Sequence, residues 1–142
     1  MVDTNVLVYA ADADAVAHDR CRGFLQECRT RRAPWYLTWS IVYEFLRVTT
    51  HPRVFRRPWS IAKALDFVDA LLESPGSRVL SHGPGHASFL AELSKEVPDL
   101  RGNLLHDAHT AALMREHGLR VIYTRDVDFH RFPSLEVRDP LA

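Results

Sequence analysis

Short β-prone segments alternate with amphipathic segments along this chain, and this alternation constrains the fold more than any other feature. Apolar residues recur at helical spacing in residues 15–32, 40–48, 61–73, 86–97 and 104–117. Apolar or aromatic runs typical of strands occupy residues 35–38, 78–81, 120–124 and 135–137. Strands that alternate with helices form a parallel sheet with helices on both faces. The sequence therefore predicts a three-layer α/β fold with a central parallel β-sheet.

The length of the chain indicates one domain. Its 142 residues are enough to bury a core, and no repeat, low-complexity tract or linker divides residues 1–142. With 46% hydrophobic and 25% charged residues, the composition is that of a soluble globular domain. No segment approaches the roughly 18 apolar residues of a membrane span, and no signal peptide opens the chain. We therefore expect a cytoplasmic domain that does not bind membranes.

The two cysteines agree with a reducing compartment. Cys21 and Cys28 lie two turns apart on one predicted helix, which is too far for a disulfide. Two thiols are also too few ligands for a structural zinc site. We predict that both are buried as small apolar residues.

Acidic residues occur where predicted strands end and helices begin. Asp3 lies in the first strand-to-helix region, Glu44 in the first turns after a strand and Asp107 near a helix start. Asp126 and Asp128 directly follow the last long strand. Each alone has a structural explanation, as a helix N-terminal charge, a solvated helix residue or a turn residue. Because ligands of doubly wound sheets bind beyond the carboxyl ends of the strands, we expect these acids to converge there.

Converging carboxylates repel one another, so they either take up protons or bind cations. Ligands that are all oxygen favour a hard ion, Mg²⁺ or Mn²⁺. Such an ion neutralises phosphate charge and activates water, and two ions roughly 3.5 to 4 Å apart serve both ends of an in-line displacement. The acids therefore predict phosphoryl chemistry with one or two metal ions.

Any polyanion must be bound by a local patch, because Lys plus Arg and Asp plus Glu both number 18. Arginines gather at Arg29, Arg31 and Arg32, and again at Arg47, Arg53, Arg56 and Arg57. The arginine fork binds phosphate through two hydrogen bonds, which makes the second group candidate RNA-backbone contacts. A solvated face or a partner surface is the alternative.

Four motifs resemble the PIN domains of the VapC toxin family. They are M-V-D-T-N-V-L-V-Y-A at residues 1–10, S-I-V-Y-E-F-L-R at 40–47, H-D-A-H-T-A-A-L at 106–113 and T-R-D-V-D-F at 124–129. The match covers nearly the whole chain, in the right order and spacing. It implies a single PIN domain over residues 1–142 and an endoribonuclease dependent on Mg²⁺ or Mn²⁺, leaving a 3′-hydroxyl and a 5′-phosphate. It also implies a toxin that is usually homodimeric and is inhibited by a VapB antitoxin, whose C-terminal segment occupies the active-site groove.

The resemblance also implies roles for individual residues. The catalytic, metal-binding acids would be Asp3, Glu44, Asp107 and Asp126, with Asp128 as a further ligand or supporting acid. The polar residues that would orient these carboxylates or a bound water are Thr4, Asn5, Ser40 and Thr124.

The opening segment departs from the family pattern. Family members usually have more strand before the first acid, whereas only Met1 and Val2 precede Asp3 here. Either the strand is shortened or the native start lies upstream. The apolar pattern of residues 5–10 by itself favours a strand, but the family has a helical turn after the first acid. We expect the family arrangement.

Polar residues near the predicted helix ends have further expected roles. Ser40 can cap the helix that it opens, and Gly118 should end the last long helix. His106 and His109 flank Asp107, and the ordinary pKa of their rings suits proton transfer. A surface hydrogen bond is the alternative for both histidines.

Other functions are compatible with a doubly wound fold and an acidic pocket. A phospho-acceptor receiver domain needs a lysine after the last strands, but Lys63 and Lys95 both lie on earlier predicted helices. A phosphohydrolase with an aspartyl nucleophile needs an acid two residues after the first, where Asn5 stands. A domain of this fold that only binds partners, without nuclease activity, is the remaining alternative.

Overall fold

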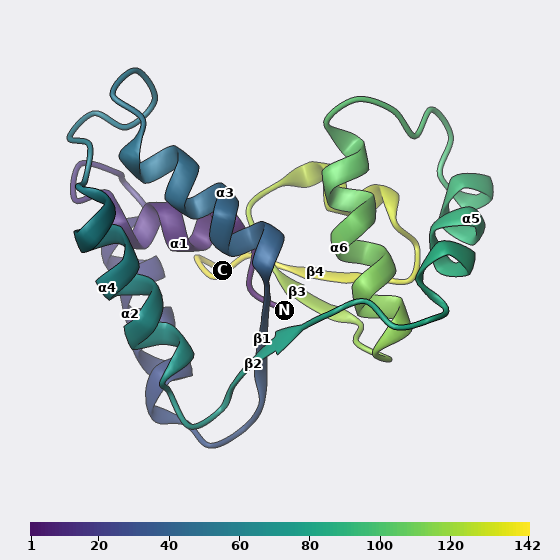
Figure 1. The fold of residues 1–142 in the computed structure, drawn as a ribbon, viewed down its shortest axis with the longest axis horizontal. Helices are drawn as coiled ribbons and strands as arrows, with labels where there is room; N and C mark the ends of the chain where they lie inside the picture. The colour runs from purple at the N-terminus through teal and green to yellow at the C-terminus, as the bar shows by residue number, and fades with distance from the viewer.

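The computed structural model describes residues 1–142, in which helices and strands alternate as predicted (Figure 1). The elements are α1 (Thr4–Ala11), α2 (His18–Thr30), β1 (Trp35–Thr38), α3 (Trp39–Thr50), α4 (Ile61–Leu72), β2 (Ser77–Leu80), α5 (His86–Glu96), α6 (Leu104–Glu116), β3 (Val121–Tyr123), the 3₁₀ helix η1 (Val127–Arg131) and β4 (Glu136–Arg138). In Figure 1, α1 to α4 gather on the left and α5 and α6 on the right, with the strands between them. The predicted α/β architecture is confirmed.

All strand pairs are parallel, as predicted. β1 pairs with β2, with Trp35 opposite Ser77, and β3 pairs with β4, with Val121 opposite Glu136. Connecting parallel strands requires crossover segments, and helices fill that role here.

The first residues of the chain join the two strand pairs. The Val2 N–H donates to the Tyr36 carbonyl at 2.9 Å, and Val2 forms a parallel bridge with Tyr123. The Asp3 N–H donates to the Tyr123 carbonyl at 3.0 Å. The opening strand therefore consists of very few residues between β1 and β3, and Asp3 lies at its carboxyl end.

The segment after Asp3 is a helix, as the family resemblance implies, so the strand favoured by the apolar pattern of residues 5–10 is wrong. The buried residues of α1 are Val6, Leu7, Ala10 and Ala11. These positions lie on one helical face, whereas a half-buried strand would bury every second residue. Asp3 caps α1, because its Oδ1 accepts the Thr4 N–H at 2.7 Å.

Of the two helix-end residues singled out in the sequence, one has the expected role. Thr38 caps α3, its Oγ1 accepting the Ile41 N–H at 3.2 Å, so the expectation that Ser40 would cap this helix is wrong. Ser40 is the second residue of the helix, because α3 begins one residue earlier than predicted, at Trp39. Gly118 follows α6 with a φ of 68°, which confirms its predicted role in ending that helix.

One hydrophobic core joins the layers. The ring of Phe45, fully buried on α3, stacks on Phe67 at a centroid distance of 5.0 Å and meets the edge of Trp59 at 6.2 Å. Cys21 and Cys28 are buried and unpaired on α2, which confirms their prediction as core residues. None of the helices has both the length and the hydropathy that crossing a bilayer requires.

Candidate active site

A groove of about 1060 Å³ opens where the opening strand and β3 end, lined by residues of α1, α3, α6 and η1. Its lining includes all five predicted acids, Asp3, Glu44, Asp107, Asp126 and Asp128. Residues separated by more than 120 positions in sequence therefore meet in one place, as expected for the carboxyl edge of a parallel sheet.

Three of these acids form a tight cluster. Asp107 lies in the first turn of α6, Asp126 caps η1 and Asp128 lies within η1. One carboxylate oxygen from each of the three lies within 4.8 Å of the other two. Asp126 is oriented by its own turn, since its Oδ1 accepts the Asp128 N–H at 2.9 Å. This oxygen-only arrangement fits Mg²⁺ or Mn²⁺.

Asp3 lies beside the cluster in a buried hydrogen-bond network. Its Oδ2 accepts from the Asn5 amide at 2.6 Å and from the Thr124 hydroxyl at 2.7 Å. Thr124 Oγ1 in turn accepts the Asp126 N–H at 2.9 Å, which links two of the acids through one hydroxyl. Burial raises the pKa of Asp3, while hydrogen bonds from Thr124 and Thr4 oppose that shift. Asn5 and Thr124 therefore contact Asp3 through their side chains, and Thr4 contacts it through its backbone N–H.

Ser40, the fourth residue predicted to orient the acids, is placed differently. Its Oγ lies 2.9 Å from Thr38 Oγ1 and 3.1 Å from His109 Nδ1. It lines the groove but makes no hydrogen bond to a carboxylate of the site. In this geometry the Ser40 hydroxyl therefore contacts Thr38 and His109 and does not orient an acid as predicted.

Glu44 lines the groove while paired with Arg47. The Arg47 guanidinium donates to both oxygens of Glu44, at 2.6 and 2.8 Å. These hydrogen bonds hold the pKa of Glu44 below its ordinary value. A metal ion that used Glu44 would have to compete with Arg47 for this carboxylate.

The predicted arginine contacts divide into two groups. Arg47 lines the groove, whereas Arg53, Arg56 and Arg57 lie in the loop between α3 and α4, outside the groove lining. Arg57 approaches Asp14 at 3.4 Å. The groove itself therefore contains one of the four arginines.

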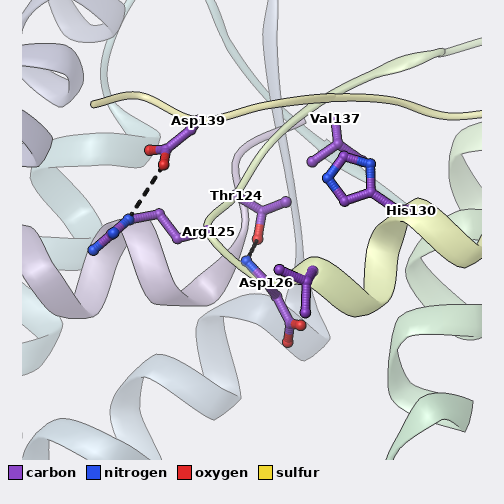
Figure 2. A pocket seen from close by; sticks show the side chains of 7 residues that line it. Thr124, Arg125, Asp126, His130, Val137 and Asp139 are labelled. Carbon is purple, nitrogen blue, oxygen red and sulfur yellow. Dashed lines mark hydrogen bonds and ion pairs between the residues drawn. The ribbon is translucent and has the colours of Figure 1, made fainter. Parts of the chain in front are cut away.

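A smaller hollow of about 210 Å³ lies behind Asp126 (Figure 2). Arg125 and Asp139 pair across it at 3.4 Å, and Figure 2 shows the Asp126 carboxylate pointing away from that pair. Arg125 is therefore occupied by Asp139 and does not neutralise the acid cluster.

The pKa of Asp107 is also raised well above its ordinary value. Burial, followed by the charges of Asp126, Asp3 and Asp128, raises its pKa to about 7. Without a cation the cluster therefore retains a proton near neutral pH. A divalent ion would remove this cost by stabilising the ionised carboxylates.

The raised pKa predicts a pH-dependent stability of the metal-free protein. Asp107 binds a proton in the folded state up to about pH 7 but has an ordinary pKa of 3.8 when unfolded. Proton binding by Asp107 therefore stabilises the fold fully below its unfolded-state pKa of 3.8. This stabilisation is lost as the pH rises through the folded-state pKa of about 7. In EDTA, we expect the Tm of the wild type to fall more between about pH 5 and about pH 8 than that of Asp107→Asn. Equal pH dependence of the two proteins would contradict this prediction.

Residues 1–135 match the PIN domain family. The chain belongs to the PIN-domain family.

Relatives of this PIN domain lie in the VapC group, as the motifs implied. It is 39% identical over 140 residues to VapC ribonuclease Mb2897 of Mycobacterium bovis, covering 99% of this chain and 94% of that protein. It is 31% identical over 140 residues to Ribonuclease VapC48 of Mycobacterium tuberculosis, covering 99% of this chain and 96% of that protein. These matches confirm the predicted VapC family.

A solved structure confirms the PIN-domain fold. The crystal structure of VapBC2 from Rickettsia felis bound to a DNA fragment from their promoter aligns with a TM-score of 0.70. The alignment covers 98% of this chain and 96% of that one at 16% sequence identity. At this identity, the likeness supports the fold alone.

The groove of this PIN domain contains residues that sequence reasoning missed. Tyr9, Tyr43 and Asn103 line it, and Tyr43 is an exposed aromatic residue beside Glu44. Because Tyr43 directly precedes the predicted acid Glu44, its sequence position could have marked it as a candidate groove residue. Tyr9 on α1 and Asn103, which directly precedes α6, carry no local pattern that marks them as groove residues.

The two histidines flanking Asp107 point to different places in the PIN domain. His106 lines the groove, while His109 contacts Ser40 and lies 2.7 Å, Nε2 to Nε2, from His82. Only His106 is therefore positioned for proton transfer in the groove. The phospho-acceptor alternative is not supported, because neither Lys63 on α4 nor Lys95 on α5 lines the groove.

Proposed function

We propose that this VapC-family PIN domain is an endoribonuclease that depends on Mg²⁺ or Mn²⁺ and acts as the toxin of a VapBC-type pair. The observation that carries the proposal is the cluster of Asp107, Asp126 and Asp128, with carboxylate oxygens within 4.8 Å of one another at one end of a large groove. The names of the relatives, which are ribonucleases, support the same activity.

The donor set fits one or two hard divalent ions. Asp107, Asp126 and Asp128 would hold an ion, with Asp3 and Glu44 completing the acidic lining. When bound, the ion supplies neutralisation of phosphate charge and activation of water.

The residues around the acids maintain this arrangement. Thr124 and Asn5 donate to Oδ2 of Asp3, and the side-chain Oδ1 of Asn5 accepts the backbone N–H of Arg125 at 3.2 Å. The backbone turn at Asp126 holds its Oδ1. Because these carboxylates are oriented before any ligand arrives, little reorganisation is needed when they bind.

The groove surface suits a single-stranded RNA segment. The Arg47 guanidinium can donate two hydrogen bonds to a phosphate when its hydrogen bonds to Glu44 are broken. The ring of exposed Tyr43 can stack on a base. Arg53, Arg56 and Arg57 would contact flanking phosphates outside the groove. Within the groove, His106 is the residue placed to exchange a proton with the leaving group.

The proposed partner is a VapB-type antitoxin, as in the Rickettsia felis VapBC2 complex. We propose that its C-terminal segment occupies the same groove and competes with RNA. The family further suggests a homodimer.

The experiment that tests the activity is cleavage of total RNA by the purified, partner-free protein. We expect cleavage with Mn²⁺ or Mg²⁺, at least about a hundredfold slower cleavage in EDTA, and recovery when excess Mn²⁺ is restored. Mapping the products would identify the cleaved site and test for a 3′-hydroxyl. Equal cleavage in EDTA and in Mn²⁺ would refute the proposed metal dependence, and no cleavage of any RNA under either condition would favour a domain that only binds partners.

A further inference from the structure

Three histidines outside the acidic groove converge on one point. His82 lies in the loop after β2, His86 is the first residue of α5 and His109 lies on α6. One ring nitrogen from each lies within 4.8 Å of the other two. The His82 and His109 Nε2 atoms are 2.7 Å apart, and the His86 ring centroid lies 4.3 Å from that of His82 and 5.6 Å from that of His109.

Two of these rings, those of His86 and His109, are contacted at Nδ1 by other side chains. Glu116 Oε2 lies 3.2 Å from His86 Nδ1, and Ser40 Oγ lies 3.1 Å from His109 Nδ1. Both contacts are made to Nδ1, so neither occupies Nε2, and the Nε2 of His109 is the atom that faces His82. A carboxylate or hydroxyl on the far nitrogen is the arrangement that fixes the tautomer and orientation of metal-binding histidines.

The loop that carries His82 is held against α6. His117 Nε2 lies 2.8 Å from the Ser81 carbonyl oxygen at the start of this loop. A Cβ on Gly83 would lie 2.5 Å from Glu116 Oε1, so the glycine leaves room for the carboxylate beside His86. Glu116 is largely buried, with 10% of its side chain exposed. A buried carboxylate needs a partner, and His86 is that partner.

We propose that His82, His86 and His109 form a second metal site, for a borderline divalent transition ion such as Zn²⁺. Imidazole nitrogens suit zinc, whereas Mg²⁺ prefers oxygen, so this site differs in chemistry from the acidic cluster. Three protein ligands leave a fourth tetrahedral position open to water or to a group of a partner.

The geometry needs a small adjustment to hold the ion. Tetrahedral zinc with bonds of about 2.0 to 2.1 Å places ligand nitrogens about 3.4 Å apart. The Nε2 atoms of His82 and His109, now 2.7 Å apart, would therefore separate by about 0.7 Å. His82 is exposed on a loop, so a rotation of its side chain supplies this movement.

The histidine site is connected to the acidic groove through α3 and α6. Ser40, which contacts His109, lies one turn before Glu44 on α3, and His109 lies two residues after Asp107 on α6. A bound ion would fasten the β2–α5 loop to α6, and through Ser40 to α3. It would therefore stabilise the two helices that carry Glu44 and Asp107.

The test is titration of untagged protein with Zn²⁺ by calorimetry, in an Asp107→Asn/Asp126→Asn background that weakens the acidic cluster. We expect one equivalent to bind, with affinity lowered at least about a hundredfold by His86→Ala or His82→Ala and about 10- to 100-fold by Glu116→Gln. Co²⁺ in place of Zn²⁺ should give the intense visible absorption of tetrahedral coordination, lost in the same variants. His51→Ala, a histidine in the loop after α3, is the matched control and should bind as the parent does.

Two results would overturn the site. One is Zn²⁺ affinity and stoichiometry in His82→Ala and His86→Ala equal to those of the parent. The other is Zn²⁺ binding that the acid substitutions abolish and the histidine substitutions leave intact. His82 is exposed, so His82→Ala should fold, and its circular dichroism spectrum should match that of the parent.

Discussion

Replacing Asp107 by Asn is expected to slow RNA cleavage by about a thousandfold or more while leaving the fold intact. The amide keeps the shape of the side chain but removes one of the three charges that would hold the ion. Metal stabilisation of transition-state charge is worth several kcal/mol, and about 4 kcal/mol corresponds to a factor of about a thousand in rate. The initial rate of cleavage at saturating Mn²⁺ measures this effect.

The control for Asp107→Asn is Asp66→Asn, the same chemical change at an exposed position on α4. It should cleave RNA at the wild-type rate. Because Asp107 is held with a raised pKa, its replacement also relieves repulsion from Asp126, Asp3 and Asp128. We therefore expect the inactive variant to have a Tm in EDTA at about pH 8 that is no lower than that of the wild type. Undiminished cleavage by Asp107→Asn would remove the proposed active site.

Replacing Asp3 by Ala should abolish cleavage and also destabilise the fold, by about 2 to 4 kcal/mol in the free energy of unfolding. The substitution removes the cap of α1, which is worth about 1 kcal/mol. It also leaves the buried Thr124 hydroxyl without its acceptor and removes one of the two acceptors of the Asn5 amide. Urea unfolding in EDTA measures the loss without a contribution from bound metal.

Two controls separate these effects of Asp3. Asp66→Ala removes an exposed acid and should change the free energy of unfolding by no more than about 0.5 kcal/mol. Asp3→Asn retains an oxygen that can accept the Thr4 N–H, so it should destabilise the fold less than Asp3→Ala while still impairing cleavage. A stability of Asp3→Ala within about 0.5 kcal/mol of the wild type would show that its hydrogen bonds do not support the fold.

Burial raises the pKa of both acids, but their contacts within the site differ. Asp3 is satisfied by three hydrogen bonds and supports the fold, whereas Asp107 is surrounded by other acids and strains the metal-free protein. The proposed metal ion would relieve the strain at Asp107, and natural proteins accept such local costs where a ligand relieves them.

Much of the fold follows from local patterns in the sequence. Helical spacing of apolar residues located α2 to α6, and short apolar runs located β1 to β4, because periodicity depends only on neighbouring residues. The meeting of the acids also followed, since the carboxyl ends of parallel strands share one edge. The conformation of residues 5–10 did not follow from the pattern alone, because a short apolar run suits a buried strand or a buried helix equally.

Only the tertiary structure determined which side chains contact one another. The sequence determined that Asp3, Glu44 and Asp107 meet at one edge of the sheet. It did not determine that Arg47 pairs with Glu44 or that Ser40 contacts His109. Nor does any local pattern unite His82, His86 and His109, whose rings meet only after the β2–α5 loop packs on α6. Element type depends on neighbours in the chain, whereas contacts between side chains depend on how the packed elements orient each rotamer, and that is a property of the whole folded domain.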